Sequence, residues 1–215
     1  ASCLVGSEMC IRDRSQSVVE KIEKSDFSVH SIEKKRVRRN PQPPFTTSTL
    51  QQEASRKLGM GASRTMQTAQ RLYEGVDIGG ETVGLITYMR TDGVQMSQEA
   101  VTAARQFIKS DYGDAFVPEK PRIYKSKAKN AQEAHEAVRP TDITRSPKTL
   151  KAYLHGDQER LYDLIWKRSV ASQMASAELD QTSVMVESSD KAITLRSSGS
   201  IIAFEGFLKV YQEDQ

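Results

Sequence analysis

The spacing of apolar residues changes twice along the chain and divides it into three parts. Residues 27–37 alternate between apolar and polar side chains, which is typical of a strand. From residue 46 onward apolar residues recur every three or four positions, which predicts helices over 46–58, 63–74, 97–110 and from 157 to about 174. Alternation returns after residue 182. The pattern therefore predicts an α+β chain in which a helical block is inserted between β segments.

Turn residues sharpen these boundaries. The prolines of 41–44 close the first strand, and the glycines of 59–61 separate the first two helices. Gly79 and Gly80 predict a hairpin turn, followed by a strand over 82–89. Two helices joined by a glycine turn and followed by a hairpin resemble a winged-helix arrangement. The hydroxyl and carboxylate residues that precede the helices are the expected N-caps: Thr46, Thr47 or Ser48, then Ser63, Ser97 and Asp157.

Charge is informative only locally. The chain has 215 residues and a formal net charge of +3, so no argument for nucleic-acid binding follows from global charge. Basic residues gather at 34–39 and again at 120–129. Such runs are usually solvated faces, and contact with phosphates is the alternative.

The cysteines and the absence of long apolar runs indicate the compartment. Cys3 and Cys10 lack partners at metal-ligand spacing, and a disulfide framework is not expected, which favours a reducing cytoplasm. No apolar stretch approaches the roughly 18 residues that span a bilayer. Residues 1–14 show no periodicity, and we expect them to be foreign to the fold. We therefore expect a soluble, cytoplasmic protein.

One short segment has chemical potential. Tyr88 stands two residues before Arg90, at the end of an apolar run. In an extended segment these two side chains point to one face, with Thr87 and Met89 on the other. A guanidinium can hold phosphate oxygens and favour the ionised form of a neighbouring phenol, so the pair is a candidate nucleophile for a phosphodiester. A half-buried strand that ends in a turn is the plainer interpretation of the same residues.

Three blocks resemble one family. Residues 85–92, LITYMRTD, resemble the active-site tyrosine motif of bacterial type IA DNA topoisomerases. Residues 44–52, PFTTSTLQQ, are similar to the start of that family's helical domain. Residues 132–141, QEAHEAVRPT, are similar to its histidine segment, with Val138 where isoleucine is more usual. The blocks follow the family's order, and the resemblance covers about 15–215.

The resemblance implies roles for individual residues. Tyr88 would attack a backbone phosphorus of single-stranded DNA and form a 5′-phosphotyrosine link, while Arg90 would hold the scissile phosphate. His135 would contact the DNA nearby. Thr87 and Asp92 are further candidate DNA contacts, and Asp92 could instead orient Arg90 or cap the next turn. The implied activity is breakage of one strand, passage of another and religation, which relaxes negative supercoils.

The chain also departs from the family pattern. In the family Mg²⁺ is bound by acidic residues of a Toprim domain, and no such acidic cluster stands in this sequence. We therefore expect an internal fragment that is inactive alone, whose Mg²⁺ is bound by a missing domain. Gly93 stands where many members have serine. The expected partners are DNA, single-stranded at the cleavage site, and the rest of the same polypeptide, in a monomer associated with the nucleoid.

The sequence predicts three structural parts after residue 14 and leaves a non-catalytic function open. We expect part of a β arch over 15–45, a helical domain bearing the catalytic tyrosine over 46–176, and the second part of the arch over 177–215. The alternative is a non-catalytic winged-helix module that reads duplex DNA through Arg64 and Arg71. A purely structural domain with basic loops is the third possibility.

Overall fold

The computed structural model describes residues 15–125 and 135–212, and contacts divide the chain into two units. We call residues 1–37 with 179–203 the sheet unit, and residues 38–178 with 204–215 the helical unit. Cys3, Cys10 and the whole segment 1–14 lie outside the described residues, as do Lys127, Lys129 and residues 132–134. The predicted boundaries after residues 45 and 176 stay predictions.

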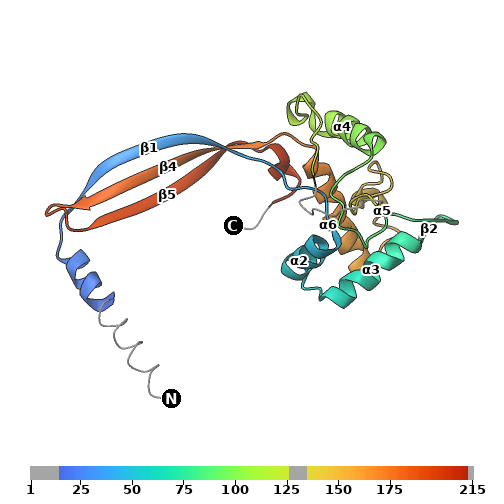
Figure 1. Ribbon diagram of the computed structural model, residues 1–215, viewed down its shortest axis with the longest axis horizontal. Coiled ribbons are helices and arrows are strands. Elements are labelled where there is room, and N and C mark those ends of the chain that lie inside the picture. Colours follow the sequence, from blue (N-terminus) through green and yellow to red (C-terminus); the bar gives the residue numbers. More distant parts are fainter. Residues whose placement is uncertain (1–14, 126–134, 213–215) are drawn as a thin grey trace, which may run out of the picture. The chain divides into compact units, whose positions relative to one another are not determined.

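The sheet unit is built on three long strands, β1 (Phe27–Arg39), β4 (Ala177–Ser188) and β5 (Thr194–Phe204), in the order β1-β4-β5 (Figure 1). His30 pairs with Glu187 and Arg36 with Asp180, so β1 and β4 run antiparallel. Ser188 donates its backbone N–H to the Ile193 carbonyl at 2.9 Å and closes the turn into β5. Every residue of β5 before Phe204 is exposed.

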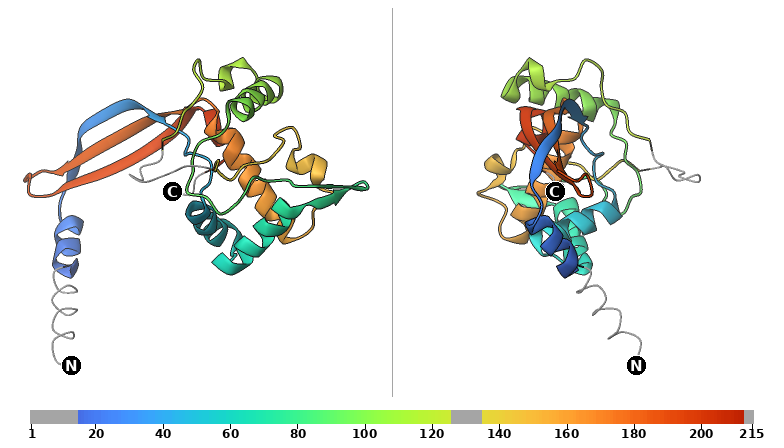
Figure 2. Two further views of the ribbon diagram at one scale, coloured as in Figure 1. Left: turned by 45° about the vertical axis from the view of Figure 1, so that its right-hand side comes forward. Right: turned by 90° about the vertical axis from the view of Figure 1, so that its left-hand side faces the viewer.

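The helical unit gathers its helices around one central helix, α6 (Asp157–Ser172), which contacts four others (Figures 1 and 2). A two-stranded hairpin and two short 3₁₀ turns complete the unit. Its remaining elements are α2 (Thr47–Leu58), α3 (Ala62–Glu74), β2 (Val76–Ile78), β3 (Glu81–Val83), α4 (Gln98–Tyr112), η1 (Asp114–Phe116), α5 (Pro147–Leu150) and η2 (Gly206–Lys209).

The core of this unit lies on α6. Leu161, Ile165 and Val170 are fully buried, as the apolar periodicity predicted. Trp166 packs edge-to-face on Phe107, with ring centroids 5.5 Å apart, and donates its indole N–H to the Ile143 carbonyl at 2.8 Å. The apolar surface of the buried indole therefore packs on an aromatic ring, and its polar N–H has a hydrogen-bond acceptor.

The mixed helix-and-sheet class is confirmed, and most helices lie where the pattern placed them. α2 begins after its N-cap Thr46 and ends at Gly59, whose φ of 66° is the left-handed conformation that glycine tolerates. Ser97 caps α4 as expected. The insertion of a winged-helix domain stays a prediction. Among the described residues, none of the helices is long and apolar enough to cross a membrane.

Two predicted caps and one predicted strand are wrong. The N-cap of α3 is Gly61, and Ser63 lies inside the first turn. The N-cap of α6 is Gly156, and Asp157 instead binds Arg64 through two hydrogen bonds. The strand expected over 82–89 ends at Val83, because the residues after it pair with separate loops and not with one neighbouring strand.

Candidate active site

Residues 84–93, which we call the Tyr88 segment, form no regular strand, yet from Tyr88 onward exposed and buried residues alternate. Leu85, Ile86 and Met89 are buried, each with 1% of its surface exposed, and Thr91 and Gly93 are buried as well. Tyr88 keeps 36% of its surface exposed, and Arg90 and Asp92 are also exposed. Tyr88 and Arg90 are therefore exposed, and the residues that follow each of them, Met89 and Thr91, are buried.

The start of α2 fixes this segment from one side. The Thr47 hydroxyl donates to the Met89 carbonyl at 2.8 Å and accepts the Thr91 backbone N–H at 2.8 Å. The Thr47 backbone N–H donates to the Thr91 carbonyl at 2.9 Å. One residue of α2 therefore holds the backbone on both sides of Arg90.

Residues 137–141 fix the segment from the other side. The Thr87 backbone N–H donates to the Arg139 carbonyl at 2.9 Å, and the Thr87 hydroxyl donates to the Ala137 carbonyl at 2.7 Å and accepts the Arg139 backbone N–H at 3.0 Å. The Thr141 backbone N–H donates to the Leu85 carbonyl at 3.0 Å. Because the Thr87 hydroxyl is engaged within the protein, its position already has a structural role, and its contact with DNA stays a prediction.

Two aromatic rings flank the Tyr88 ring. The Tyr73 ring, at the end of α3, meets it edge-to-face with centroids 5.5 Å apart and planes at 68°. The His135 ring lies 5.3 Å away, with planes at 50°. The three resembling blocks thus converge on one place, where the Tyr88 and His135 rings lie side by side. Whether His135 contacts DNA stays a prediction.

The Arg90 and Asp92 side chains are both exposed. Among the described residues, neither the Arg90 guanidinium nor the Asp92 carboxylate has a hydrogen bond or an ion pair. The turn after Arg90 is closed instead by the Thr91 hydroxyl, which accepts the Gly93 backbone N–H at 2.9 Å. Thr91 therefore takes the capping role expected of Asp92, and Arg90 remains available to an external anion.

A second arginine near the segment is already neutralised. Arg139 donates from Nε to Oε2 of Glu136 at 2.6 Å, and the same carboxylate oxygen accepts the Ser97 backbone N–H at the start of α4. Burial by itself raises the pKa of Glu136, but the bonds from Arg139 and Ser97 outweigh it and hold the pKa below its usual value. Glu136 is therefore a structural carboxylate that joins the histidine block to α4.

Gly93 has a close contact that bears on the departure from the family pattern. A Cβ at this position would lie 2.4 Å from the His135 carbonyl oxygen. Real Cβ atoms do not approach backbone so closely, so serine here would require the His135 backbone to shift. Gly93 is thus matched to the present placement of His135.

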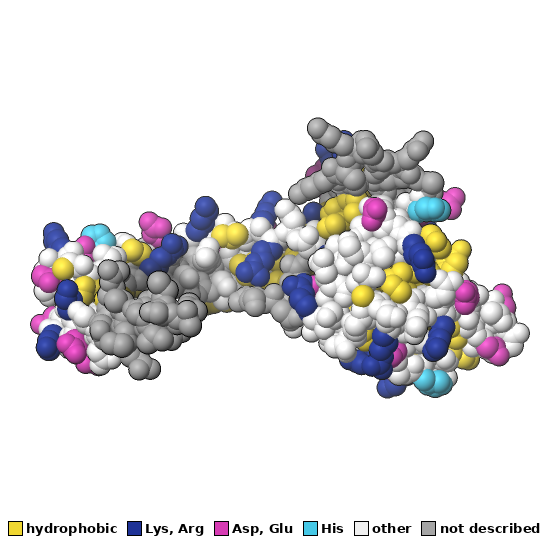
Figure 3. Space-filling view, turned by 60° about the horizontal axis from the view of Figure 1, so that its bottom comes forward, with side chains coloured by type: hydrophobic (Ala, Val, Ile, Leu, Met, Phe, Trp, Pro, Cys, Tyr) yellow, Lys and Arg dark blue, Asp and Glu magenta, His cyan; other side chains and the backbone are white. Residues whose placement is uncertain are grey.

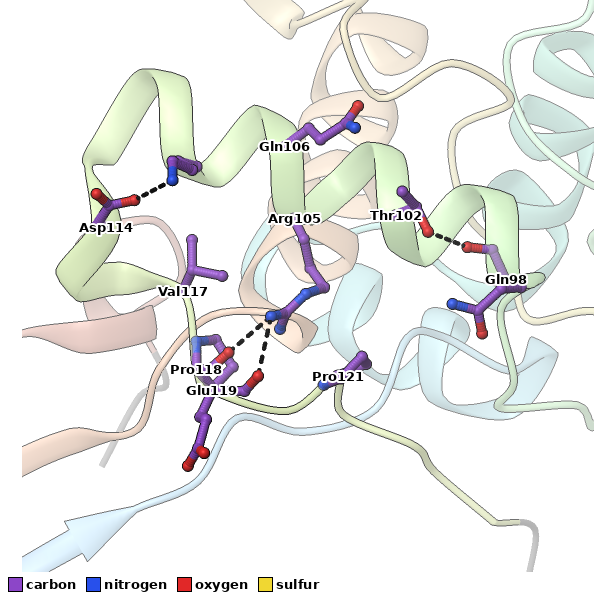
Figure 4. Close-up of a pocket in the computed structure, with 10 residues that line it drawn as sticks. Gln98, Thr102, Arg105, Gln106, Asp114, Val117, Pro118, Glu119 and Pro121 are labelled. Carbon is purple, nitrogen blue, oxygen red and sulfur yellow. Dashed lines mark hydrogen bonds and ion pairs between the residues drawn. The ribbon is translucent and has the colours of Figure 1, made fainter.

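A cavity of about 430 Å³ lies between α4 and residues 114–121 (Figure 4), and Arg105 crosses it to donate to the Pro118 carbonyl at 2.8 Å. None of its lining residues belongs to the Tyr88 segment. Within 15–125 and 135–212, no three His, Cys, Asp or Glu side chains gather as metal ligands would.

The basic runs are partly used inside the protein. Arg36 and Arg38, from the first run, pair with Asp180 and Glu178 on β4. Arg122, from the second, donates to the Met174 carbonyl and the Ser176 hydroxyl, both at 2.8 Å. In Figure 3 lysine and arginine side chains are spread over the face shown and do not gather in one patch.

The winged-helix alternative relied on Arg64 and Arg71. Arg64 is held by Asp157 through two hydrogen bonds, at 2.5 and 3.0 Å, so its guanidinium is committed within the protein. Arg71 is exposed. Reading a groove needs side chains that can reach base edges, and one of the two candidates is already occupied.

Sequence reasoning missed two residues of the site. The sequence indicates Thr47 only as a candidate helix cap within the block 44–52, and it places Tyr73 only in the helix predicted over 63–74. The hydroxyl of Thr47 reaches across 42 residues to the Met89 carbonyl, a contact that no local pattern encodes. The apolar spacing of α3 did place Tyr73 on its helix, but nothing in that spacing indicates which ring it meets.

Comparison with known proteins gives one family throughout. A family model described as DNA topoisomerase matches residues 6–215. DNA topoisomerase 1 of Rickettsia bellii is 56% identical over 199 residues, which are 93% of this chain and 25% of that protein. DNA topoisomerase 1 of Zymomonas mobilis is 52% identical over 208 residues, 96% of this chain and 16% of that protein.

A solved structure of a topoisomerase I has a similar fold. Full-length topoisomerase I from Thermotoga maritima superposes with a TM-score of 0.80 at 35% identity, over 93% of this chain and 32% of that one. The chain spans about a quarter or less of the length of these curated relatives.

Proposed function

Because this chain belongs to the bacterial DNA topoisomerase I family, we propose that it supplies the nucleophile and one wall of the DNA site of a type IA enzyme. That enzyme would break one strand of DNA, let another pass and reseal the break, relaxing negative supercoils. The partners would be single-stranded DNA at the cleavage site and the rest of the polypeptide, in a monomer that works at the cytoplasmic nucleoid.

Tyr88 is the proposed nucleophile. Its phenolic oxygen attacks the phosphorus of a backbone phosphodiester as the phenol loses its proton. A Tyr88–phosphorus ester bond forms and the bond from phosphorus to the 3′ oxygen breaks. The departing oxygen takes up a proton and becomes a free 3′-hydroxyl, while the other DNA end stays as a 5′-phosphotyrosine. One ester replaces another, so resealing needs no nucleotide cofactor.

The observation that carries the proposal is the exposed pair Tyr88 and Arg90 on a backbone fixed from both sides. Tyr88 is 36% exposed, and Arg90, two residues later, is also exposed on a segment bound to Thr47 and Arg139. A guanidinium placed beside the phosphate holds it and stabilises the charge of the transition state. His135 would contact the DNA backbone next to the site. Thr87 and Asp92 would lie at the edge of the contact.

Mg²⁺ is the metal that the family implies. Among the described residues no group of three or more His, Cys, Asp or Glu side chains could hold such an ion, so this part of the chain does not fit it. We propose that the ion is bound by a domain outside this chain, and no step above depends on it. The isolated chain is then expected to be inactive on DNA.

A chimera tests the proposal. The chain replaces the matching 199 residues of Rickettsia bellii DNA topoisomerase 1. The chimera is incubated with Mg²⁺ and single-stranded oligonucleotides that carry a label at either the 3′ or the 5′ end. We expect the 3′ label to become attached to protein on a denaturing gel, and the 5′ label to be released on a shorter strand.

Matched variants decide the outcome. Tyr88→Phe should abolish the adduct, and Tyr153→Phe, which alters another exposed tyrosine, should leave it unchanged. An adduct that persists in Tyr88→Phe would show that another residue is the nucleophile. Attachment of the 5′ label would reverse the proposed polarity. Arg90→Gln should reduce adduct formation by about 10²- to 10³-fold, the usual cost of losing one oxyanion donor.

A further inference from the structure

The orientation of the Tyr88 phenol depends on a second tyrosine. Tyr88 belongs to a segment without regular secondary structure and leaves 36% of its surface open, so the protein encloses only part of the ring. An open tyrosine can adopt several rotamers, and attack on phosphorus requires one of them. The contacts around the ring must therefore select the rotamer.

The rigid contact is Tyr73. It stands in the last turn of α3 and meets the Tyr88 ring edge-to-face, at 5.5 Å between centroids and 68° between planes. This is a preferred geometry for two aromatic rings, with the positive edge of one toward the negative face of the other. Tyr73 itself is 40% exposed, so the contact lies at the surface where the substrate would arrive.

The backbone of Tyr73 is pressed directly against the Tyr88 segment. The Leu85 backbone N–H donates to the Leu72 carbonyl at 2.8 Å. A Cβ at Gly84 would lie 2.7 Å from the Tyr73 carbonyl oxygen, a distance that only glycine permits. The end of α3 and the start of the Tyr88 segment are therefore fixed to one another, and the Tyr73 ring has a set place beside Tyr88.

We propose that Tyr73 is a positioning residue, which holds the Tyr88 phenol in the rotamer that attacks DNA, and that Gly84 makes this possible by admitting the Tyr73 carbonyl. The inference rests on the proposed role of Tyr88 as nucleophile. His135 bounds the ring from another side at 5.3 Å. Its own backbone meets Gly93, so each flanking ring is set by a glycine of the Tyr88 segment.

The test is single-turnover cleavage by the chimera described above, with the DNA dissociation constant measured in parallel. Tyr73→Leu removes the ring, and we expect the cleavage rate constant at saturating DNA to fall about three- to tenfold, the size expected for one lost edge-to-face contact. The dissociation constant should not change. Tyr73→Phe keeps the ring and should restore the rate. Gly84→Ala should lower the rate in the same direction as Tyr73→Leu.

Tyr153→Leu is the matched control, because Tyr153 is equally exposed, at 40%, and belongs neither to α3 nor to the Tyr88 segment. An unchanged rate in Tyr73→Leu overturns the inference. A larger DNA dissociation constant with an unchanged cleavage rate constant also overturns it, and would make Tyr73 a DNA contact. Neither result affects the proposed function, which fails if Tyr88→Phe still forms the adduct or if the 5′ label becomes attached to the protein. Circular dichroism of each variant checks that the fold is kept.

Discussion

The helical unit and the sheet unit are stabilised in opposite ways. In the helical unit Phe45, Leu161 and Ile165 are fully buried in a continuous apolar core. In the sheet unit β5 is exposed along nearly its whole length, and Ile201 leaves 76% of its surface open. Leu179 is the one apolar residue of the described sheet unit that is buried. Its strands rely on backbone pairing and on exposed charge pairs such as that of Arg36 and Asp180.

The difference explains where the candidate active site lies. A nucleophile must meet phosphorus in a narrow range of distances and angles, and only a supported backbone can hold it there. The Tyr88 segment lies on the unit with the core, and hydroxyls and backbone groups of distant blocks bind it. Exposed charge pairs, which contribute little to stability, could not fix a side chain to that degree.

Hydrogen exchange should show the largest contrast. Amides of α6, such as those of Leu164 and Ile165, should open only with global unfolding of their unit, because they lie in its core. Amides of β5 should exchange through local opening. We expect the two opening free energies to differ by roughly 3 kcal/mol or more. Mass-spectrometric exchange on intact protein measures both sets, and equal protection would contradict the contrast.

Removing one apolar side chain from each unit sharpens the comparison. Phe45 is fully buried and lies under the Arg168 guanidinium, whose carbon is 5.0 Å from the ring centroid. Phe45→Ala should destabilise the helical unit by about 3–5 kcal/mol. Ile201→Ala should change stability by less than about 0.5 kcal/mol, because the side chain is already in water. Urea unfolding followed by circular dichroism measures both, and a comparable loss in Ile201→Ala would show that β5 is covered in solution.

The polar contacts of the site can be separated from the core. Thr47→Val removes the hydroxyl that binds the Met89 carbonyl and the Thr91 N–H, at almost constant volume. Two partly buried backbone groups lose a partner, so we expect a cost of about 1–3 kcal/mol. Adduct formation in the chimera should also fall, because the backbone around Arg90 is no longer held. Unfolding and single-turnover cleavage are measured on the same preparation.

Thr102→Val is the control for that substitution. Its hydroxyl, on the exposed side of α4, donates to the Gln98 carbonyl one turn earlier. We expect little change in stability and none in cleavage. If Thr47→Val behaved like Thr102→Val, the hydrogen bonds to the Tyr88 segment would not be what positions it.

The sequence predicted what local rules determine. The boundaries of α2 follow from Thr46 and Gly59, whose side chain and backbone freedom act within one turn. The buried stripe of α6 follows from apolar periodicity. The alternation of residues 87–90 predicted that Tyr88 and Arg90 face away from Met89, and both are exposed while Met89 is buried, even though the regular strand ends at Val83. The exposure of a side chain depends on the local direction of the backbone, whereas a regular β-strand needs a neighbouring strand to hydrogen-bond with.

The errors concern partners that are distant in sequence. Asp157 has the residue type of a cap, but it binds Arg64, which is 93 positions away. Thr47 and Tyr73 entered the site only through contacts with the Tyr88 segment. The family resemblance placed Tyr88 and Arg90 together, and their chemical roles stay predictions. Periodicity describes one face of one element, so it cannot identify the residue that this face meets.

We expect the smallest effect on stability from removing the charge of a single carboxylate, Glu136 in the helical unit or Asp180 in the sheet unit. The pKa of Glu136 is held low: burial opposes the shift, and hydrogen bonds from Arg139 and Ser97 outweigh it. A lowered pKa stabilises the fold above the ordinary value of 4.5, and the stabilisation is lost as pH falls through the folded-state value. Glu136→Gln should therefore be less stable than wild type at pH 7, by less than about 1 kcal/mol because the pair is partly open to solvent. The gap should close below pH 4.5.

Asp180→Asn provides the matching change in the sheet unit. The side-chain bond from Arg36 also lowers the pKa of Asp180, but this carboxylate is exposed and solvent screens it. Its pH dependence should be weaker and should shrink further in high salt, whereas that of Glu136, supported by a backbone N–H, should persist. Urea unfolding between pH 7 and pH 3.5, at low and high salt, measures both. A pH-independent difference for Glu136→Gln would mean that the carboxylate acts through packing and not through its charge.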